Sequence, residues 1–276
     1  MQDICRQGRE VRRMKYSLLI MGSGGQGVLS AGGSLAASAS EVGYATFVPW
    51  YGAAQRGGVA KCTIVLSDKP ILSPLPGKCM GMIAMNEDAV QKGLEELKSG
   101  GLLIRNIDRC KKRFRGGDCI LIDVPADSMA KELGDPRMAN NILTGALLGF
   151  TKMLPPEAVE KGIRAKLSGK SEEVAELNVK ALMEGVRFGA DSSNAQEIAP
   201  RVEKECRYGM DKTTVGEILD TPELRAIVER LFPQVLNHPL LEAGRTFKFA
   251  DAVPYMKDMI KDEDLDNFQD ALEELG

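Results

Sequence analysis

The chain has 276 residues, of which 43% are hydrophobic and 27% are charged, and this is ordinary for a globular protein. Its formal net charge is −3, which argues against general binding to nucleic acid. No stretch approaches the roughly 18 apolar residues that can span a membrane, so we expect no membrane association. The length suffices for one sizeable domain, or for one domain and a small module.

The first part of the chain alternates between predicted strands and helices. Residues 1–13 are charged and lack an apolar core, so we expect a loose tail or a natural start at Met14 rather than a secretory signal. Strands are predicted at 16–21, 44–50, 59–67, 79–85, 101–106 and 118–124, with one short edge strand in the proline-rich stretch 68–78. Helices are predicted at 27–41, 86–100, 126–134, 137–154, 155–169 and 171–189. Residues 14–190 are thus predicted to form an α/β domain, a three-layer sandwich with a mostly parallel sheet.

The composition changes near residue 190. Residues 191–212 are polar and are predicted to be a linker. Residues 213–276 show amphipathic helical segments without strand patterns, which predicts a small all-helical appendage. Its end, 251–276, is rich in acids, as expected for a solvated face or, alternatively, for docking to a basic partner.

The six cysteines are scattered and none forms a CxxC pair. This spacing suits reduced thiols in a cytoplasmic protein and predicts that the chain alone binds no metal. The one histidine, His238, lies far from the glycine-rich segments in the sequence and is expected to be a structural or surface residue. We therefore expect no catalytic residue of the Ser–His or Cys–His type.

A glycine-rich segment follows the first predicted strand and opens the first predicted helix. Its pattern, G-x-G-x-x-G, is made by Gly22, Ser23, Gly24, Gly25, Gln26 and Gly27. Such a loop lets the backbone approach a ligand, and the helix N-terminus then favours a phosphate. Alternatively, the glycines serve only tight packing between strand and helix.

The surrounding sequence disfavours the common nucleotides as ligands. A dinucleotide site requires an acidic residue at the end of the second strand, where this chain has Val48-Pro49-Trp50-Tyr51. A P-loop requires Lys after its last glycine, where this chain has Val28. NAD, FAD and ATP are therefore all poor candidates.

A second glycine-rich segment follows the second predicted strand. Because loops at the carboxyl ends of parallel strands share one edge of a sheet, we expect the two segments to lie together. An arginine between them would bind a phosphate or carboxylate by charge-assisted hydrogen bonds. Alternatively, it would form a subunit contact or a surface salt bridge. The candidate binding residues of this segment are Tyr51, Gln55, Arg56, Gly57 and Gly58.

Three motifs together resemble a known family: "GSGGQGVLSAGGSLA" from residue 22, "YGAAQRGGVAKCTIVLSD" from residue 51 and "RMANNILTGALLG" from residue 137. They resemble the gamma subunit of 2-oxoacid:ferredoxin oxidoreductases over residues 14–190. The "AQRGG" sequence is closer to indolepyruvate enzymes. Tyr51-Gly52 is like the 2-oxoglutarate, pyruvate and branched-chain forms, so the 2-oxoacid stays open.

The resemblance implies a role in a multisubunit enzyme. Such complexes oxidatively decarboxylate a 2-oxoacid to its acyl-coenzyme A and reduce ferredoxin. Thiamine diphosphate and Mg lie on the alpha and beta subunits, and iron–sulfur clusters lie on a delta, ferredoxin-like subunit. The gamma chain would help to close around coenzyme A, whose diphosphate suits two glycine loops and an arginine.

Two other classes of function remain open at this point. One is a stand-alone NAD(P)-dependent oxidoreductase, against which the missing acid near residue 50 argues. The other is a non-catalytic assembly module, in which the helical appendage recruits a partner; this appendage faintly resembles a module found in unrelated proteins. The basic stretch 105–115 is expected to be a solvated turn, or a dock for an acidic surface such as ferredoxin.

Overall fold

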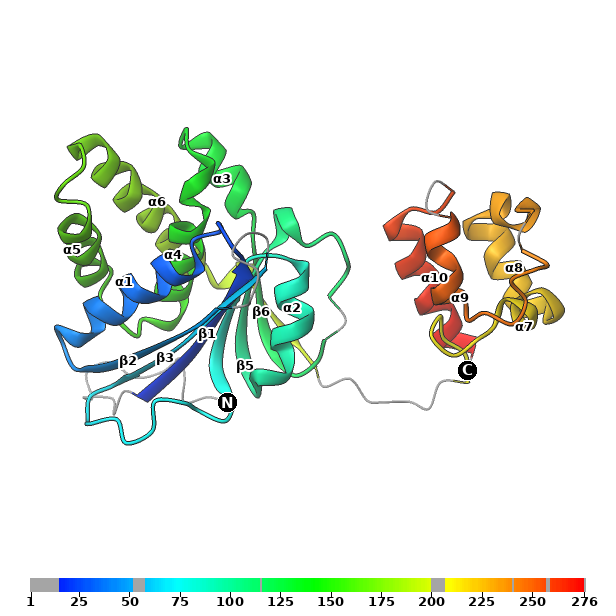
Figure 1. The fold of residues 1–276 in the computed structure, drawn as a ribbon, viewed down its shortest axis with the longest axis horizontal. Coiled ribbons are helices and arrows are strands. Elements are labelled where there is room, and N and C mark those ends of the chain that lie inside the picture. Colours follow the sequence, from blue (N-terminus) through cyan, green and yellow to red (C-terminus); the bar gives the residue numbers. More distant parts are fainter. Residues whose placement is uncertain are drawn as a thin grey trace. The chain divides into compact units, whose positions relative to one another are not determined.

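The computed structural model describes residues 15–51, 58–114, 116–199, 207–239, 241–256 and 259–275, with only the backbone at 51, 262, 263, 273 and 274. The chain divides into two units (Figure 1). The first comprises residues 1–110 and 116–200, and the second comprises residues 111–115 and 201–276. Each unit has its own hydrophobic core.

The described part of the first unit contains a seven-stranded sheet in the order β2-β3-β1-β4-β5-β6-β7. The strands are β1 (Lys15–Ser23), β2 (Tyr44–Tyr51), β3 (Val59–Ser67), β4 (Cys79–Ala84), β5 (Leu97–Asn106), β6 (Cys119–Val124) and β7 (Ala195–Ile198). β1, β4, β5 and β6 pair in parallel, whereas β3 is antiparallel to β1 and β2, and β7 is antiparallel to β6. β2 therefore runs in the same direction as β1, with β3 between them.

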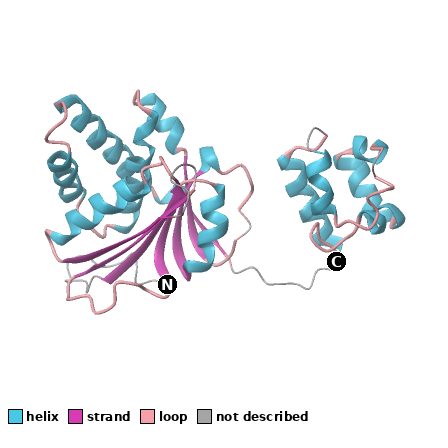
Figure 2. Cartoon of the chain, in the orientation of Figure 1, coloured by secondary structure: helices cyan, strands magenta, loops and turns pink. Residues whose placement is uncertain are grey.

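Helices cover both faces of this sheet (Figure 2). They are α1 (Val28–Ser40), α2 (Glu87–Gly93), α3 (Ala126–Glu132), α4 (Ala139–Thr151), α5 (Pro156–Lys166) and α6 (Glu172–Ala190). α2 packs on one face, where Gly93 lies against Met21 and Met82. The other helices share a core with the alternate strand residues Ile20 and Ile83, which point to the opposite face. The predicted α/β sandwich is confirmed.

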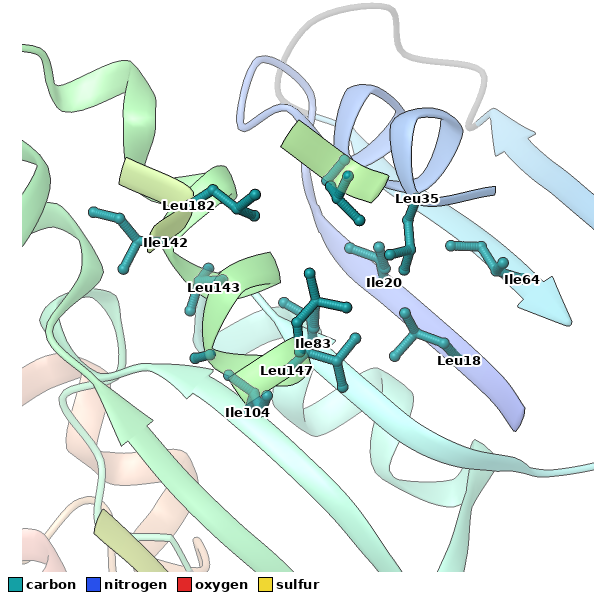
Figure 3. Close-up of a cluster of buried hydrophobic side chains, with 14 of the residues drawn as sticks. Leu18, Ile20, Leu35, Ile64, Ile83, Ile104, Ile142, Leu143, Leu147 and Leu182 are labelled. Carbon is teal, nitrogen blue, oxygen red and sulfur yellow. The ribbon is translucent and has the colours of Figure 1, made fainter. Parts of the chain in front are cut away.

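The larger core forms where α1 and α4 meet the sheet. Figure 3 shows Leu35 of α1 beside Ile20 and Ile64, and Leu147 of α4 beside Ile83. All five of these side chains are fully buried. Burial of a side chain of this size contributes roughly 1.5–3 kcal/mol, so this layer is a main source of the unit's stability. It also holds the middle of α1 against β1 and β3.

α4 and α6 pack backbone to backbone through glycines spaced four residues apart. A Cβ on Gly145 or Gly149 of α4 would lie 2.1 Å from a carbonyl oxygen of α6. A Cβ on Gly185 or Gly189 of α6 would lie 2.1 or 2.0 Å from a carbonyl oxygen of α4. Glycine is therefore required on both sides of this helix pair.

The predicted helix at 86–100 is too long at its C-terminal end. α2 ends at Gly93, a 3₁₀ turn follows at Leu94–Glu96, and β5 begins at Leu97. Leu97 is buried and pairs with Cys79 of β4. The contact with a neighbouring strand outweighs the helical pattern of the local sequence.

Two further predictions about strands are also wrong. No strand forms within 68–78, all of which is described, because its prolines cannot donate ladder hydrogen bonds. Conversely, the stretch predicted as a linker contains β7, which pairs with β6 at the edge of the sheet. β7 is mostly exposed, so it lacks the apolar alternation that would reveal a strand.

The second unit is helical, as predicted. Its helices are α7 (Val215–Asp220), α8 (Pro222–Leu231), α9 (Phe249–Ala252) and α10 (Asp262–Leu275). Three buried rings form its centre, with centroids 4.7–5.8 Å apart: Phe232, Phe249 and Phe268. In the described part of the chain, no helix has both the length and the apolar character to cross a membrane.

Candidate functional site

The first glycine segment forms a tight loop between β1 and α1. Gly25 and Gly27 have φ angles of +93° and +79°, a region that side chains rarely adopt. A Cβ on Gly22 would lie 2.9 Å from the Cβ of Met85, and one on Gly27 would lie 2.6 Å from the side-chain nitrogen of Asn140. Gly25 is therefore required by its backbone conformation, Gly22 by the lack of space, and Gly27 by both.

The side chain of Gln26 folds back into the loop. Its Oε1 accepts hydrogen bonds from the backbone N–H of Ser23, at 2.6 Å, and from Nδ2 of Asn86, at 2.8 Å. Its Nε2 donates to the carbonyl oxygen of Met85 at 3.4 Å. Gln26 thus positions the loop against the end of β4.

Asn86 connects the glycine loop to α2. Its Oδ1 accepts from the backbone N–H of Ala89 and caps the helix, while its Nδ2 donates to Ser23 Oγ at 2.9 Å and to Gln26. The sequence pattern identifies Asn86 only as an N-cap. Its second role depends on β4 lying next to β1, which no local pattern indicates.

The two glycine segments meet, as the sequence predicts. The backbone N–H of Gly24 donates to the carbonyl oxygen of Gly58 at 2.9 Å. The reason is the direction of the strands: β1 and β2 both end at this edge, and β3 returns between them from Val59, which pairs with Ser23. Tyr51 ends β2 at the same edge. Gln55, Arg56 and Gly57 lie outside the described residues.

One helix begins beside this loop without a neutralising side chain. α1 follows Gly27 and has neither a side-chain N-cap nor an acidic residue in its first turn. α4 also passes close by, since its Asn140 borders Gly27, but α4 continues from the 3₁₀ turn Pro136–Met138, which the Asp135 side chain caps. The positive end of the α1 dipole therefore favours an anion here. Asn140 lies within the "RMANN" motif, but its place at the loop is a property of the tertiary structure.

The basic stretch between β5 and β6 does not form a single solvated turn. Arg105 is only 3% exposed and makes two hydrogen bonds, of 2.7 and 2.8 Å, to Asp123. Arg109 pairs with Asp127 at the start of α3, at 2.5 Å. These two arginines therefore pair with carboxylates of the same unit, Arg105 in a buried position and Arg109 in an exposed one.

The remainder of the basic stretch belongs to the second unit. The backbone N–H of Arg113 donates to Asp266 at 2.9 Å, and its guanidinium donates to Asp270 at 3.1 Å. Part of the acidic segment 251–276 thus contacts basic residues of its own chain. The docking of either segment to a partner stays a prediction.

The described cysteines are buried, and their thiols are protonated at neutral pH. Burial raises the pKa of Cys62 and Cys110 to about 12, and that of Cys79 and Cys119 to about 11. Thiols with such pKa values are poor nucleophiles at neutral pH. Within the described ranges, no three His, Cys, Asp or Glu side chains are grouped so that they could hold a metal ion.

Comparison with known proteins gives a consistent picture of the first unit. Residues 17–188 match the family model described as pyruvate ferredoxin/flavodoxin oxidoreductase. The chain is 32% identical over 176 residues to the ketoisovalerate oxidoreductase subunit VorA of Methanothermobacter thermautotrophicus. The aligned region covers 63% of this chain and 36% of VorA. The chain thus spans about a third of the length of this relative.

Two further relatives match over nearly their whole length. The 2-oxoglutarate synthase subunit KorC of Methanocaldococcus jannaschii is 29% identical over 165 residues, covering 58% of this chain and 88% of KorC. The solved gamma subunit of a keto/oxoacid ferredoxin oxidoreductase from Geobacter sulfurreducens is 29% identical with a TM-score of 0.58. That match covers 66% of this chain and 99% of the Geobacter chain.

Proposed function

Because the chain belongs to the pyruvate ferredoxin/flavodoxin oxidoreductase family, we propose that it is the gamma-type subunit of a 2-oxoacid:ferredoxin oxidoreductase. The complex would oxidatively decarboxylate a 2-oxoacid to its acyl-coenzyme A and pass the electrons to ferredoxin. The relatives named for ketoisovalerate and 2-oxoglutarate support the reaction class and leave the choice of 2-oxoacid open.

In this proposal the chain contributes the contact with coenzyme A. The observation that carries it is the junction of the two glycine segments, Gly24 to Gly58, beside the uncapped start of α1. The first N–H groups of α1 and the positive end of its dipole, beside this junction, suit the diphosphate of coenzyme A. Arg56, between these glycines in the sequence, would add a charge-assisted bond.

The proposal assigns the remaining cofactors to partner subunits. Thiamine diphosphate with Mg would lie on alpha and beta subunits, and iron–sulfur clusters on a delta, ferredoxin-like subunit. The buried, dispersed cysteines Cys62, Cys79, Cys110 and Cys119 do not fit a cluster site, which needs thiolates grouped around the metal. No catalytic residue is proposed for this chain, because the thiamine cofactor supplies the carbanion chemistry.

Purification under anaerobic conditions through a tag on this chain tests the assembly. We expect larger partners, bound thiamine diphosphate and iron–sulfur absorbance to co-elute, and a panel of 2-oxoacids then identifies the substrate. A chain that elutes alone and colourless would contradict the proposal. It would favour the assembly module or, if NAD(P)H binds, the stand-alone oxidoreductase.

Substitution of Arg56 tests the coenzyme contact in the purified complex. We expect Arg56→Ala to raise the KM for coenzyme A at least tenfold and to change that for the 2-oxoacid little. Lys78→Ala is the matched control, because Lys78 is an exposed cation that precedes β4 at the opposite edge of the sheet. An equal effect of both substitutions, or none, would reject the proposed contact.

A further inference from the structure

The second unit contains a cavity of about 340 Å³ that the proposed function does not use. Its walls come from the start of α7, from the connection between α8 and α9, and from α9 with the turn after it. Most of the lining is apolar, including Leu241, Phe247 and Met256. His238 and Tyr255, whose side chains carry polar atoms, also line the cavity. The cavity thus combines an apolar surface with a few polar groups, as ligand sites do.

The wall formed by the connection is held in place by its own backbone. Successive hydrogen bonds of 2.9–3.2 Å run from His238 to Val235, from Leu241 to His238, from Gly244 to Leu241 and from Phe247 to Gly244. Each runs from a backbone N–H to the carbonyl oxygen three residues earlier. The described part of this wall is therefore held by successive turns that continue from the 3₁₀ helix Pro233–Asn237.

The same wall is attached to α7. The backbone N–H of Val215 donates to the carbonyl oxygen of Phe247 at 2.9 Å, and that of Gly216 donates to Arg245 at 2.9 Å. A Cβ on Gly216 would lie 3.0 Å from that carbonyl oxygen, so the approach is close. The cavity is thus largely preformed, which lowers the entropic cost of binding a ligand.

The cavity is not a defect of the core. Phe232, Phe249 and Phe268 fill the centre of the unit, and each is at most 1% exposed. By contrast, Phe247 and Tyr255 at the cavity are 51% and 69% exposed. An apolar molecule that covers these two rings would remove their apolar surface from water, which favours binding.

We propose that this cavity binds a small amphiphilic molecule, with a hydrocarbon or aromatic body against the apolar wall and one polar group toward His238 and Tyr255. A cavity of about 150 Å³ holds benzene, so about 340 Å³ suits two fused rings or a medium-length chain. The site is separate from the glycine loop and does not depend on the proposed function.

Fluorescence titration of the full chain with 8-anilinonaphthalene-1-sulfonate tests the site. Ala243 is an exposed lining residue, so the indole of Ala243→Trp can occupy the cavity without disturbing the core. Ala226→Trp is the control, on an exposed position of α8 that does not line the cavity. We expect saturable binding that decanoate displaces in the wild type and in A226W, and at least tenfold weaker binding in A243W.

Tyr255→Ala provides a second variant at an exposed position, and we expect severalfold weaker binding there. Far-UV circular dichroism and the melting temperature establish that each variant is folded. The proposal is overturned by absence of saturable binding, by binding that decanoate does not displace, or by equal binding in folded A243W, Y255A and wild-type chains.

Discussion

At the scale of single residues, the glycine loop combines backbone strain with crowding. Gly25 and Gly27 both have positive φ angles, but a Cβ on Gly25 would meet nothing within 4 Å. A Cβ on Gly27 would collide with Asn140. Alanine substitutions at these two positions therefore separate the cost of the backbone conformation from the cost of steric crowding.

We expect Gly25→Ala to lower the free energy of unfolding by about 1–2 kcal/mol, the cost of a left-handed conformation for a residue with a Cβ. Gly27→Ala should cost more, because Asn140 must also move. Urea unfolding of the three proteins measures the difference. Equal losses would show that Asn140 yields freely and does not restrict the loop.

Asn86→Asp separates the two roles of Asn86. The carboxylate keeps an acceptor for Ala89, so α2 stays capped, but it has no donor for Ser23 Oγ and Gln26 Oε1. We expect faster amide hydrogen exchange at Gly24–Gly27 with little change at Val90. Asn86→Ala should accelerate exchange in both places, at a cost of about 1 kcal/mol for the lost cap. Unchanged loop exchange in N86D would contradict the positioning role.

At the scale of elements, the α4–α6 pair depends on glycines inside both helices, although glycine lowers the helix propensity of a sequence. Glycine inside a helix costs roughly 0.5–1 kcal/mol relative to alanine. The four glycines of this pair are nevertheless required, since each would place a Cβ against the backbone of the other helix. Close packing of the pair outweighs helix propensity.

Gly185→Ala is therefore expected to destabilise the first unit by about 1–3 kcal/mol or more, as overpacking of a core does. Gly33→Ala in α1 is the matched control, because a Cβ there meets nothing within 4 Å. It should stabilise the unit by about 0.5–1 kcal/mol. Thermal unfolding of both variants gives opposite shifts if this reasoning holds, and shifts of the same sign refute it.

At the scale of the whole molecule, the two units have separate hydrophobic cores, so their free energies of unfolding should be partly independent. The first core lies between the sheet and α1, α3, α4, α5 and α6, and the second surrounds Phe232, Phe249 and Phe268. The buried residues of one core do not occur in the other. Each unit should accordingly unfold in its own transition.

Phe268→Ala tests this independence. Truncation of a buried phenylalanine costs about 3–5 kcal/mol, a large part of the stability of a small helical unit. We expect calorimetry to show loss or a large downward shift of one transition and an unchanged second transition. Phe247→Ala, at a half-exposed ring, is the control and should change neither by much. A joint shift of both transitions in F268A would mean that the units fold together.

Much of the fold was predictable because it depends on local patterns. Apolar runs such as Leu18–Met21 and Ile64–Leu66 indicate buried strands, and the glycine segment after Met21 indicates a ligand loop. β7 was missed because an exposed edge strand carries no apolar alternation. The end of α2 was misplaced because Leu97 is assigned to a strand by its contact with β4 and not by its neighbours in sequence.

By itself, the sequence determined the class of fold, the family resemblance and the glycine segments, since these depend on short-range periodicity and composition. Only the tertiary structure decided that Gly24 contacts Gly58, that Asn86 and Asn140 border the loop, and that the second unit has an open cavity at its surface. The physical reason is that each of these features is a contact between strands or helices distant in the chain. Their register is set by packing of the whole core, which no local pattern specifies.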